Sequence, residues 1–255
     1  MKSRNILFIC EGSNYEPKFI KRLFDTCYKD SYTTYSYNTN IHILANHIET
    51  DYPDFDDGFT DILGILKDYE SDPEKSKILN QQYTDIFLIF DFDPQDHVTN
   101  FKMIRRMLEY YTNSTDQGKL FINYPMMQSY KHFQHLPDDN FKNVVVKVEE
   151  CKNYKKQVGE ISNYTNIETY DYITFISLTV HHLRKANYIL QGIYDELTLE
   201  DYFNITSNLV YDKQISLLQK TNCVFVLNTC IFILIDFSPQ KFFNSISKNK
   251  SSFLI

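Results

Sequence analysis

The chain has 255 residues, of which 43% are hydrophobic and 16% aromatic, and its formal net charge is −7. With 20 Tyr, 20 Phe and only 6 Gly, the composition indicates a globular chain with a real core and excludes an intrinsically disordered one. The negative net charge argues against a protein that coats nucleic acid without specificity. It does not exclude a nucleic-acid enzyme, whose basic residues can be concentrated on one face.

The cysteines are scattered without any C-x-x-C spacing. They are Cys10, Cys27, Cys151, Cys223 and Cys230. Their odd number, and the absence of a secretory segment at the start of the sequence, favour reduced thiols in a cytoplasmic protein and argue against zinc. The apolar run 223–237 is shorter than the roughly 20 residues that span a bilayer, so we interpret it as a buried helix or strand and expect no membrane partner.

The first half of the chain alternates between apolar runs typical of strands and amphipathic stretches typical of helices. Strands are expected at 4–10, 40–45, 84–90 and 119–123. Helices are expected near 17–28, 58–70 and 99–111, and Tyr124-Pro125 is expected to open a further one. This alternation predicts an α/β fold with a mainly parallel sheet flanked by helices.

The second half has mostly helical periodicity, so we expect an α/β domain over 1–136 and a mainly helical region over 137–255. Residues 208–235 are apolar enough for one long or two shorter buried helices. The basic stretch 181–185 is expected on a solvated helix face. A lysine-rich interval around Tyr154 is a charged surface or a nucleic-acid contact strip; its lysines are Lys142, Lys147, Lys152, Lys155 and Lys156.

Carboxylates follow two of the predicted strands. Glu11 comes after the first strand, and Asp91 and Asp93 come after the strand at 84–90. Ligands gather at the carboxyl ends of strands in an open α/β sheet, and residues i and i+2 of an extended segment point to the same side. If the two strands are neighbours, these three carboxylates converge and need a cation, for which Mg²⁺ or Mn²⁺ is the ordinary choice with oxygen ligands.

Four further side chains are candidates for the same site. Glu16 is either another metal ligand or an acid that suits a helix start. Gln128, Lys131 and His132 are spaced to share one side of a helix after the strand at 119–123. Lys131 and His132 would hold a phosphate or assist proton transfer there, and a surface helix with ordinary polar residues is the alternative. Walker-A, G-x-G-x-x-G and G-x-S-x-G patterns are absent from the sequence.

Three segments in this order resemble the TOPRIM-domain nucleases, in particular the RloB-like and OLD-type families. Phe8-Ile9-Cys10-Glu11-Gly12, continuing to Glu16-Pro17-Lys18-Phe19, is similar to their "CEG…TEP.Y" start. Leu88-Ile89-Phe90-Asp91-Phe92-Asp93 is similar to their D-x-D strand, and Tyr124-Pro125-Met126-Met127-Gln128-Ser129-Tyr130 to a later "NP..E.W/Y" block. The resemblance covers about residues 1–135 and depends on the order and spacing of the three blocks together.

The resemblance implies a metal-dependent nuclease in which Glu11, Asp91 and Asp93 bind Mg²⁺ for phosphodiester cleavage. It also implies a role in bacterial anti-phage defence, with a nucleic-acid substrate (DNA or RNA, tRNA included) and often an ABC-type ATPase as a partner protein; homo-oligomer formation stays open.

The chain departs from the family at Gln128, where relatives usually carry a glutamate. This departure keeps open an attenuated binding or regulatory subunit of a defence complex. Because D-x-D alone fits several phosphoryl-transfer folds, a D-x-D phosphatase or phosphotransferase with Asp91 as nucleophile is a further alternative.

Overall fold

The computed structural model describes residues 4–28, 30–96 and 99–248. The chain divides into two compact units. The first comprises Met1–Phe24, Tyr28–Asp91 and Asp96–Phe121, and the second comprises Asp25–Cys27, Phe92–Gln95 and Ile122–Ile255. The main division therefore follows Phe121, earlier than the change at residue 136 that the sequence pattern suggests.

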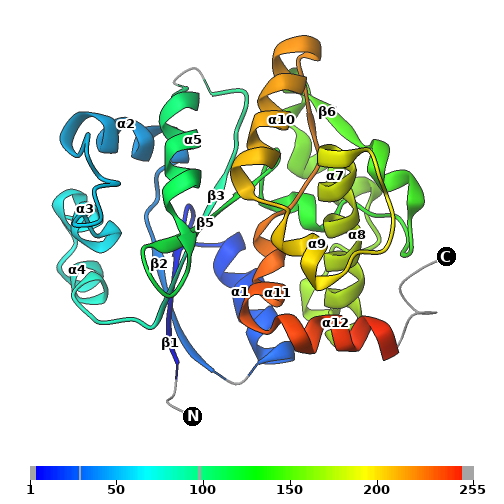
Figure 1. The fold of residues 1–255 in the computed structure, drawn as a ribbon, viewed down its shortest axis with the longest axis horizontal. Helices are drawn as coiled ribbons and strands as arrows, with labels where there is room; N and C mark the ends of the chain where they lie inside the picture. Colours follow the sequence, from blue (N-terminus) through cyan, green and yellow to red (C-terminus); the bar gives the residue numbers. More distant parts are fainter. Residues whose placement is uncertain (1–3, 29, 97–98, 249–255) are drawn as a thin grey trace. The chain divides into compact units, whose positions relative to one another are not determined.

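The first unit is built on a five-stranded sheet, which confirms the predicted α/β class (Figure 1). Its strand order is β2-β1-β3-β5-β4. The bounds are β1 Asn5–Cys10, β2 Ser31–Ser36, β3 Asp85–Asp91, β4 Thr112–Asn113 and β5 Gly118–Asn123. Strand β1 runs parallel to both β2 and β3, while β4 and β5 are antiparallel. Three of the predicted strands, at 4–10, 84–90 and 119–123, are confirmed.

The strand predicted at 40–45 is wrong, because those residues begin helix α2, Ile41–Asp51. Asn40 caps this helix by accepting a hydrogen bond from the Ile43 backbone N–H at 2.9 Å. The second strand of the sheet is instead β2, which carries β-branched and aromatic residues. The other helices of this half are α1 Tyr15–Cys27, α3 Ile62–Tyr69, α4 Pro73–Leu79 and α5 Phe101–Tyr110.

Aromatic rings form the core on one face of the sheet. Phe8 of β1 stacks on Phe87 of β3 with ring centroids 5.3 Å apart, and Phe87 stacks on Phe121 of β5 at 6.2 Å. Phe24 of α1 meets the Phe8 ring edge-on at 5.2 Å. All four side chains are at most 2% exposed. This packing holds the central strands in register, so it also fixes where their carboxyl ends lie.

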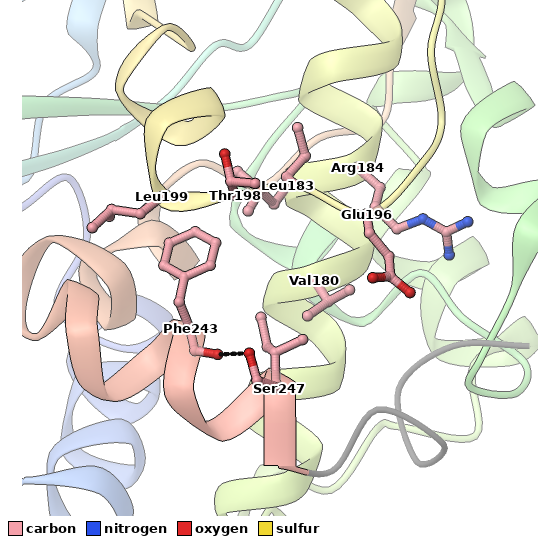
Figure 2. Close-up of a pocket in the computed structure, with 10 residues that line it drawn as sticks. Val180, Leu183, Arg184, Glu196, Thr198, Leu199, Phe243 and Ser247 are labelled. Carbon is pink, nitrogen blue, oxygen red and sulfur yellow. Dashed lines mark hydrogen bonds between the residues drawn. The ribbon is translucent and has the colours of Figure 1, made fainter.

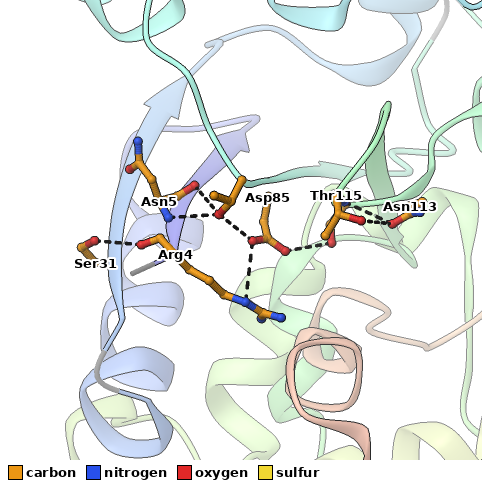
Figure 3. Close-up of polar contacts among 8 residues, drawn as sticks. Arg4, Asn5, Ser31, Asp85, Asn113 and Thr115 are labelled. Atoms are coloured by element: carbon orange, nitrogen blue, oxygen red, sulfur yellow. Dashed lines mark hydrogen bonds and ion pairs between the residues drawn. The ribbon is translucent and has the colours of Figure 1, made fainter. Parts of the chain in front are cut away.

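A polar cluster closes the opposite, amino-terminal edge of the same strands (Figure 3). The carboxylate of Asp85 is 3% exposed and accepts hydrogen bonds from Thr84 Oγ1 at 2.8 Å and Ser114 Oγ at 3.3 Å. The Arg4 guanidinium lies 3.9 Å away. Asp85 is thus a buried strand-start acid with ordinary structural partners.

The second unit is mainly helical, as predicted, and is organised around the 20-residue helix α8, Tyr172–Gln191. A two-stranded antiparallel sheet joins β6 Val145–Lys147 to β7 Cys223–Phe225. The other α-helices are α6 Val148–Cys151, α7 Tyr154–Ile161, α9 Leu199–Phe203, α10 Ser207–Thr221, α11 Ile233–Phe237 and α12 Pro239–Lys248. Short 3₁₀ turns occur at η1 Met127–Lys131, η2 Asp139–Asn143, η3 Ile167–Thr169 and η4 Cys230–Phe232.

Buried polar side chains complete the edges of the small sheet. Gln214 of α10 bonds both backbone groups of Phe225: its Nε2 donates to the carbonyl at 3.0 Å and its Oε1 accepts from the N–H at 2.9 Å. Lys185 of α8 donates to the Val144 carbonyl at 2.6 Å. Both side chains are fully buried. Gln214 supplies partners for both backbone groups of Phe225, and Lys185 is a second donor to the Val144 carbonyl, which also accepts from the Val226 N–H at 3.2 Å. None of the described helices combines the length and apolar character that crossing a bilayer requires.

Candidate functional site

Glu11 and Asp91 lie together at the carboxyl ends of two neighbouring strands. Strands β1 and β3 are paired in parallel with Cys10 opposite Ile89, which meets the condition that the sequence left open. The Glu11 backbone N–H donates to the Ile89 carbonyl at 3.0 Å. The Glu11 side chain turns toward β3, where its Oε2 accepts a hydrogen bond from the Asp91 backbone N–H at 3.0 Å. The first unit therefore brings together two of the predicted carboxylates.

The backbone of Glu11 is also fixed from the side of β2. Tyr37 donates its N–H to the Cys10 carbonyl at 2.9 Å, and Asn38 donates to the Glu11 carbonyl at 2.8 Å. Asn38 has a φ of 61°, in the left-handed region that asparagine tolerates better than most residues. Sequence reasoning missed these two positions because it placed the second strand after them. The signal that could have found them is the run of Tyr and Thr in β2.

Glu16 folds back over the turn that follows Glu11. Its side chain is 5% exposed, and a Cβ on Gly12 would lie 3.3 Å from Glu16 Oε2, so this approach favours glycine at position 12. Burial and the Glu16 carboxylate raise the pKa of the Cys10 thiol well above its usual range. Cys10 is therefore a protonated thiol at neutral pH, the weakly nucleophilic form of cysteine.

Asp93 does not continue the extended geometry of β3. The strand ends at Asp91, and Asp93 has a φ of 42°. Its N–H donates to the Pro125 carbonyl at 3.1 Å, and its Oδ1 accepts from Gln95 Nε2 at 3.0 Å. The expectation that Asp91 and Asp93 lie on one extended segment is wrong, because the strand ends at Asp91 and the chain turns at Asp93. They also belong to different units, Asp91 to the first and Asp93 to the second.

The segment after β5 is a 3₁₀ turn, Met127–Lys131, and not the α-helix expected there. Side chains at i and i+3 eclipse in a 3₁₀ helix, so Gln128 and Lys131 share a side while His132, the residue after the turn, does not. Gln128 is 4% exposed, and Lys131 is only half-buried.

His132 Nδ1 lies 2.9 Å from the Tyr154 hydroxyl. Burial is the main cause that lowers the pKa of His132 to about 4. His132 is therefore neutral at pH 7, and it can exchange hydrogen bonds but adds no positive charge for a phosphate.

The basic stretch on α8 is buried, so the prediction of a solvated face is wrong. His181, His182 and Lys185 are fully buried, and Arg184 is 8% exposed. Arg184 pairs with Asp139 at 3.1 Å and covers the Tyr194 ring with its guanidinium 4.2 Å from the centroid.

In the lysine-rich interval, Lys147, Lys152, Lys155 and Lys156 are exposed, but Tyr154 is 1% exposed. Tyr154 therefore offers no face on which a base could stack.

The second unit contains a cavity of about 510 Å³ bounded by α8, α9 and α12 (Figure 2). Its walls are mostly apolar, with Val180 and Leu183 on one side and Phe243 on another. The hydroxyls at its rim already have partners: Ser247 donates to the Phe243 carbonyl at 3.0 Å, and Thr198 donates to Asp201 at 2.7 Å. None of the predicted site residues lines this cavity.

A magnesium ion suits the oxygen donors at the first unit's strand ends. Mg²⁺ is commonly bound through one or two protein carboxylates, its other positions being filled by water and substrate phosphates. Glu11 and Asp91 are both half-buried and provide two such carboxylates on adjacent strands. Over residues 4–28, 30–96 and 99–248, the structure places no three His, Cys, Asp or Glu side chains together as a ready-made metal cage.

Comparisons with protein-family models, with curated proteins and with solved structures found no match.

Proposed function

We propose that the protein is a metal-dependent TOPRIM-like nuclease that cleaves phosphodiester bonds in DNA or RNA. The observation that carries this proposal is the hydrogen bond from the Asp91 N–H to Glu11 Oε2 at 3.0 Å. It joins the first two of three motif blocks whose order resembles that of TOPRIM nucleases. A strand-end glutamate alone fits many turns, and D-x-D alone fits several phosphoryl-transfer folds, whereas the pair on adjacent parallel strands is more specific.

Glu11 and Asp91 would hold the ion, and their backbone hydrogen bonds keep the two strand ends in place before any substrate arrives. An Mg²⁺ ion held there would polarise a phosphate oxygen as a Lewis acid and would orient a water molecule. By the resemblance, Asp93 would be the third carboxylate, Glu16 would be a further acidic ligand, and Gln128 would take a neutral ligand position. Lys131 is the cationic side chain proposed to contact phosphate, and His132, neutral at pH 7, would exchange a proton or a hydrogen bond.

Cleavage assays with the purified protein test this proposal. The substrates are single- and double-stranded DNA, RNA and tRNA, each with Mg²⁺, Mn²⁺ or EDTA. Asp91→Asn and Glu11→Gln remove one charge each and should abolish metal-dependent cleavage. Asp85→Asn is the matched control, since it removes a carboxylate from the other end of the same strand. Cleavage that survives Asp91→Asn would overturn the proposal.

The neutral side chain of Gln128 favours a second candidate, an attenuated subunit that binds nucleic acid or a partner without cutting. Glutamine binds a hard cation less strongly than a carboxylate does, and Gln128 is 4% exposed. Binding of nucleic acid without cleavage under every metal condition, unchanged in Glu11→Gln, would favour this candidate. The role in anti-phage defence and the ABC-type ATPase partner are carried by the resemblance, and co-purification with that partner tests them.

A further inference from the structure

We propose that His182 and Asn228 form a buried clamp that positions the turn Met127–Lys131. The clamp takes its functional meaning from the proposed function, because this turn carries Gln128 and Lys131. His182 lies on α8 and Asn228 follows β7, and both side chains are fully buried. Neither residue is a catalytic residue; each acts through the turn that it holds.

Asn228 fastens the turn directly. Its Nδ2 donates to the Met127 carbonyl at 2.9 Å and lies 3.3 Å from Ser129 Oγ. Its Oδ1 accepts from the Ile231 N–H at 3.1 Å. One carboxamide therefore ties the turn to the chain segment that begins η4, with both of its polar atoms in use.

His182 bonds both the turn and the backbone of Asn228. Its Nδ1 accepts a hydrogen bond from the Asn228 backbone N–H at 3.1 Å, and its Nε2 lies 3.4 Å from the Tyr130 carbonyl. A carbonyl can only accept, so the proton of the neutral ring is on Nε2. A methyl or phenyl group in its place would remove both of these buried hydrogen bonds.

The neighbouring His181 provides an internal contrast. It is equally buried, but its Nδ1 donates to the Ser177 carbonyl at 2.8 Å and its Nε2 accepts from the Asp138 N–H at 2.9 Å. Two adjacent histidines on one helix therefore have opposite tautomers, and only His182 bonds the turn. His181 is the matched control for effects of burial and volume.

The first experiment compares hydrogen exchange in His182→Phe, His182→Asn and His181→Phe. The reporters are the N–H groups of Asn228, Ser129 and His132, the last two of which close the turn through bonds to Met126 and Ser129 carbonyls. Relative to global unfolding of the same variant, His182→Phe should lower their protection about tenfold, the size of one net hydrogen bond. His182→Asn keeps an acceptor for the Asn228 N–H and should restore that residue's protection, while His181→Phe should leave all three unchanged.

Equal losses in the two phenylalanine variants, or no loss in His182→Phe, would overturn the clamp. If His182→Phe does not fold, ¹⁵N NMR of the wild-type imidazoles decides. An Nε2–H tautomer at His182 together with Nδ1–H at His181 supports the clamp, and Nδ1–H at His182 overturns it. A wild-type protein that never cleaves nucleic acid would defeat the proposed function and leave this exchange result intact, so the two failures are distinguishable.

Discussion

The side chain of Glu11 accepts a hydrogen bond from the backbone N–H of Asp91, a residue 80 positions further along the chain. Parallel pairing of β1 with β3 makes this contact possible, since it places Cys10 opposite Ile89 and ends the two strands at one edge. The contact orients a carboxylate whose position would otherwise depend on a flexible side chain. It also makes Glu11 a structural residue as well as a candidate ligand.

This double role predicts different outcomes for two substitutions of Glu11. Glu11→Gln keeps an oxygen for the Asp91 N–H and should change the free energy of unfolding by less than about 1 kcal/mol. Glu11→Ala leaves that N–H without its side-chain acceptor and should cost about 1–3 kcal/mol. Urea unfolding measures both. If the two variants were equally stable, the hydrogen bond would contribute nothing, whatever their nuclease activities.

The strand ends were readable from sequence because buried parallel strands are continuous apolar runs, and β1 and β3 both have this form. Strand β2 has a Tyr- and Thr-rich sequence at a sheet edge, while the start of α2 is an apolar run that imitates a strand. The Asn40 cap and the Tyr and Thr residues of β2 are local signals that separate the two, but the pairing of β2 with β1 is a long-range contact that a local pattern does not show.

The buried basic residues of α8 show a different limit of sequence reasoning. His181, His182 and Lys185 look like a solvated stretch because their sequence letters are polar. They are buried because each finds a backbone partner far along the chain, at Asp138, Asn228 and Val144 respectively. Such long-range partners have no local signature, so sequence reasoning could not reveal that these side chains belong to the core.

We predict that substituting Gly118, the first residue of β5, with any residue that has a side chain destabilises the protein. Its φ is +106°, and a Cβ there would lie 3.0 Å from Leu88 Cδ1. Gly118→Ala should therefore destabilise the protein by about 1–3 kcal/mol through backbone strain and overpacking. Gly64 of α3 is the control, because a Cβ there meets nothing within 4 Å. Gly64→Ala should raise stability by up to about 1 kcal/mol through helix propensity. Thermal unfolding of both variants checks the contrast, and equal effects would contradict it.

Lys185 is predicted to reduce stability at neutral pH. Burial lowers the pKa of its ammonium well below the usual range, so the unfolded chain binds a proton that the folded chain resists. Stability should therefore rise with pH between the folded pKa and the unfolded value near 10.5. Lys185→Met should increase the free energy of unfolding at pH 7 by about 1 kcal/mol or more and flatten this dependence.

The Lys185→Met substitution should be tolerated because the Val144 carbonyl keeps its bond from the Val226 N–H at 3.2 Å. Lys185→Ala is the companion variant: it also removes the charge but leaves a cavity beside Phe141, whose ring centroid lies 4.3 Å from Nζ. It should be less stable than Lys185→Met at every pH. Urea titrations between pH 7 and 10 measure both effects, and a wild-type slope unchanged in Lys185→Met would contradict the assignment.

His132 is predicted to make the folded state sensitive to acid. Its pKa is lowered from 6.5 to about 4, mainly by burial. Between these two values the unfolded state binds the proton and the folded state does not, so stability falls as the pH drops from 6.5 to 4. The loss attributable to His132 has an upper bound of about 3.5 kcal/mol, at about 1.4 kcal/mol per pKa unit.

His132→Gln removes the titration while keeping a polar group beside the Tyr154 hydroxyl, so it should flatten the acid limb of the stability curve. His135→Gln is the matched control, because that histidine is exposed three residues later and bonds only locally, at the Pro137 carbonyl. Free energies of unfolding measured in urea from pH 7 to 4 should separate the two variants. Parallel curves for wild type and His132→Gln would show that burial of His132 does not govern the acid response. The loss of stability in acid would then come from protonation of other groups in the fold.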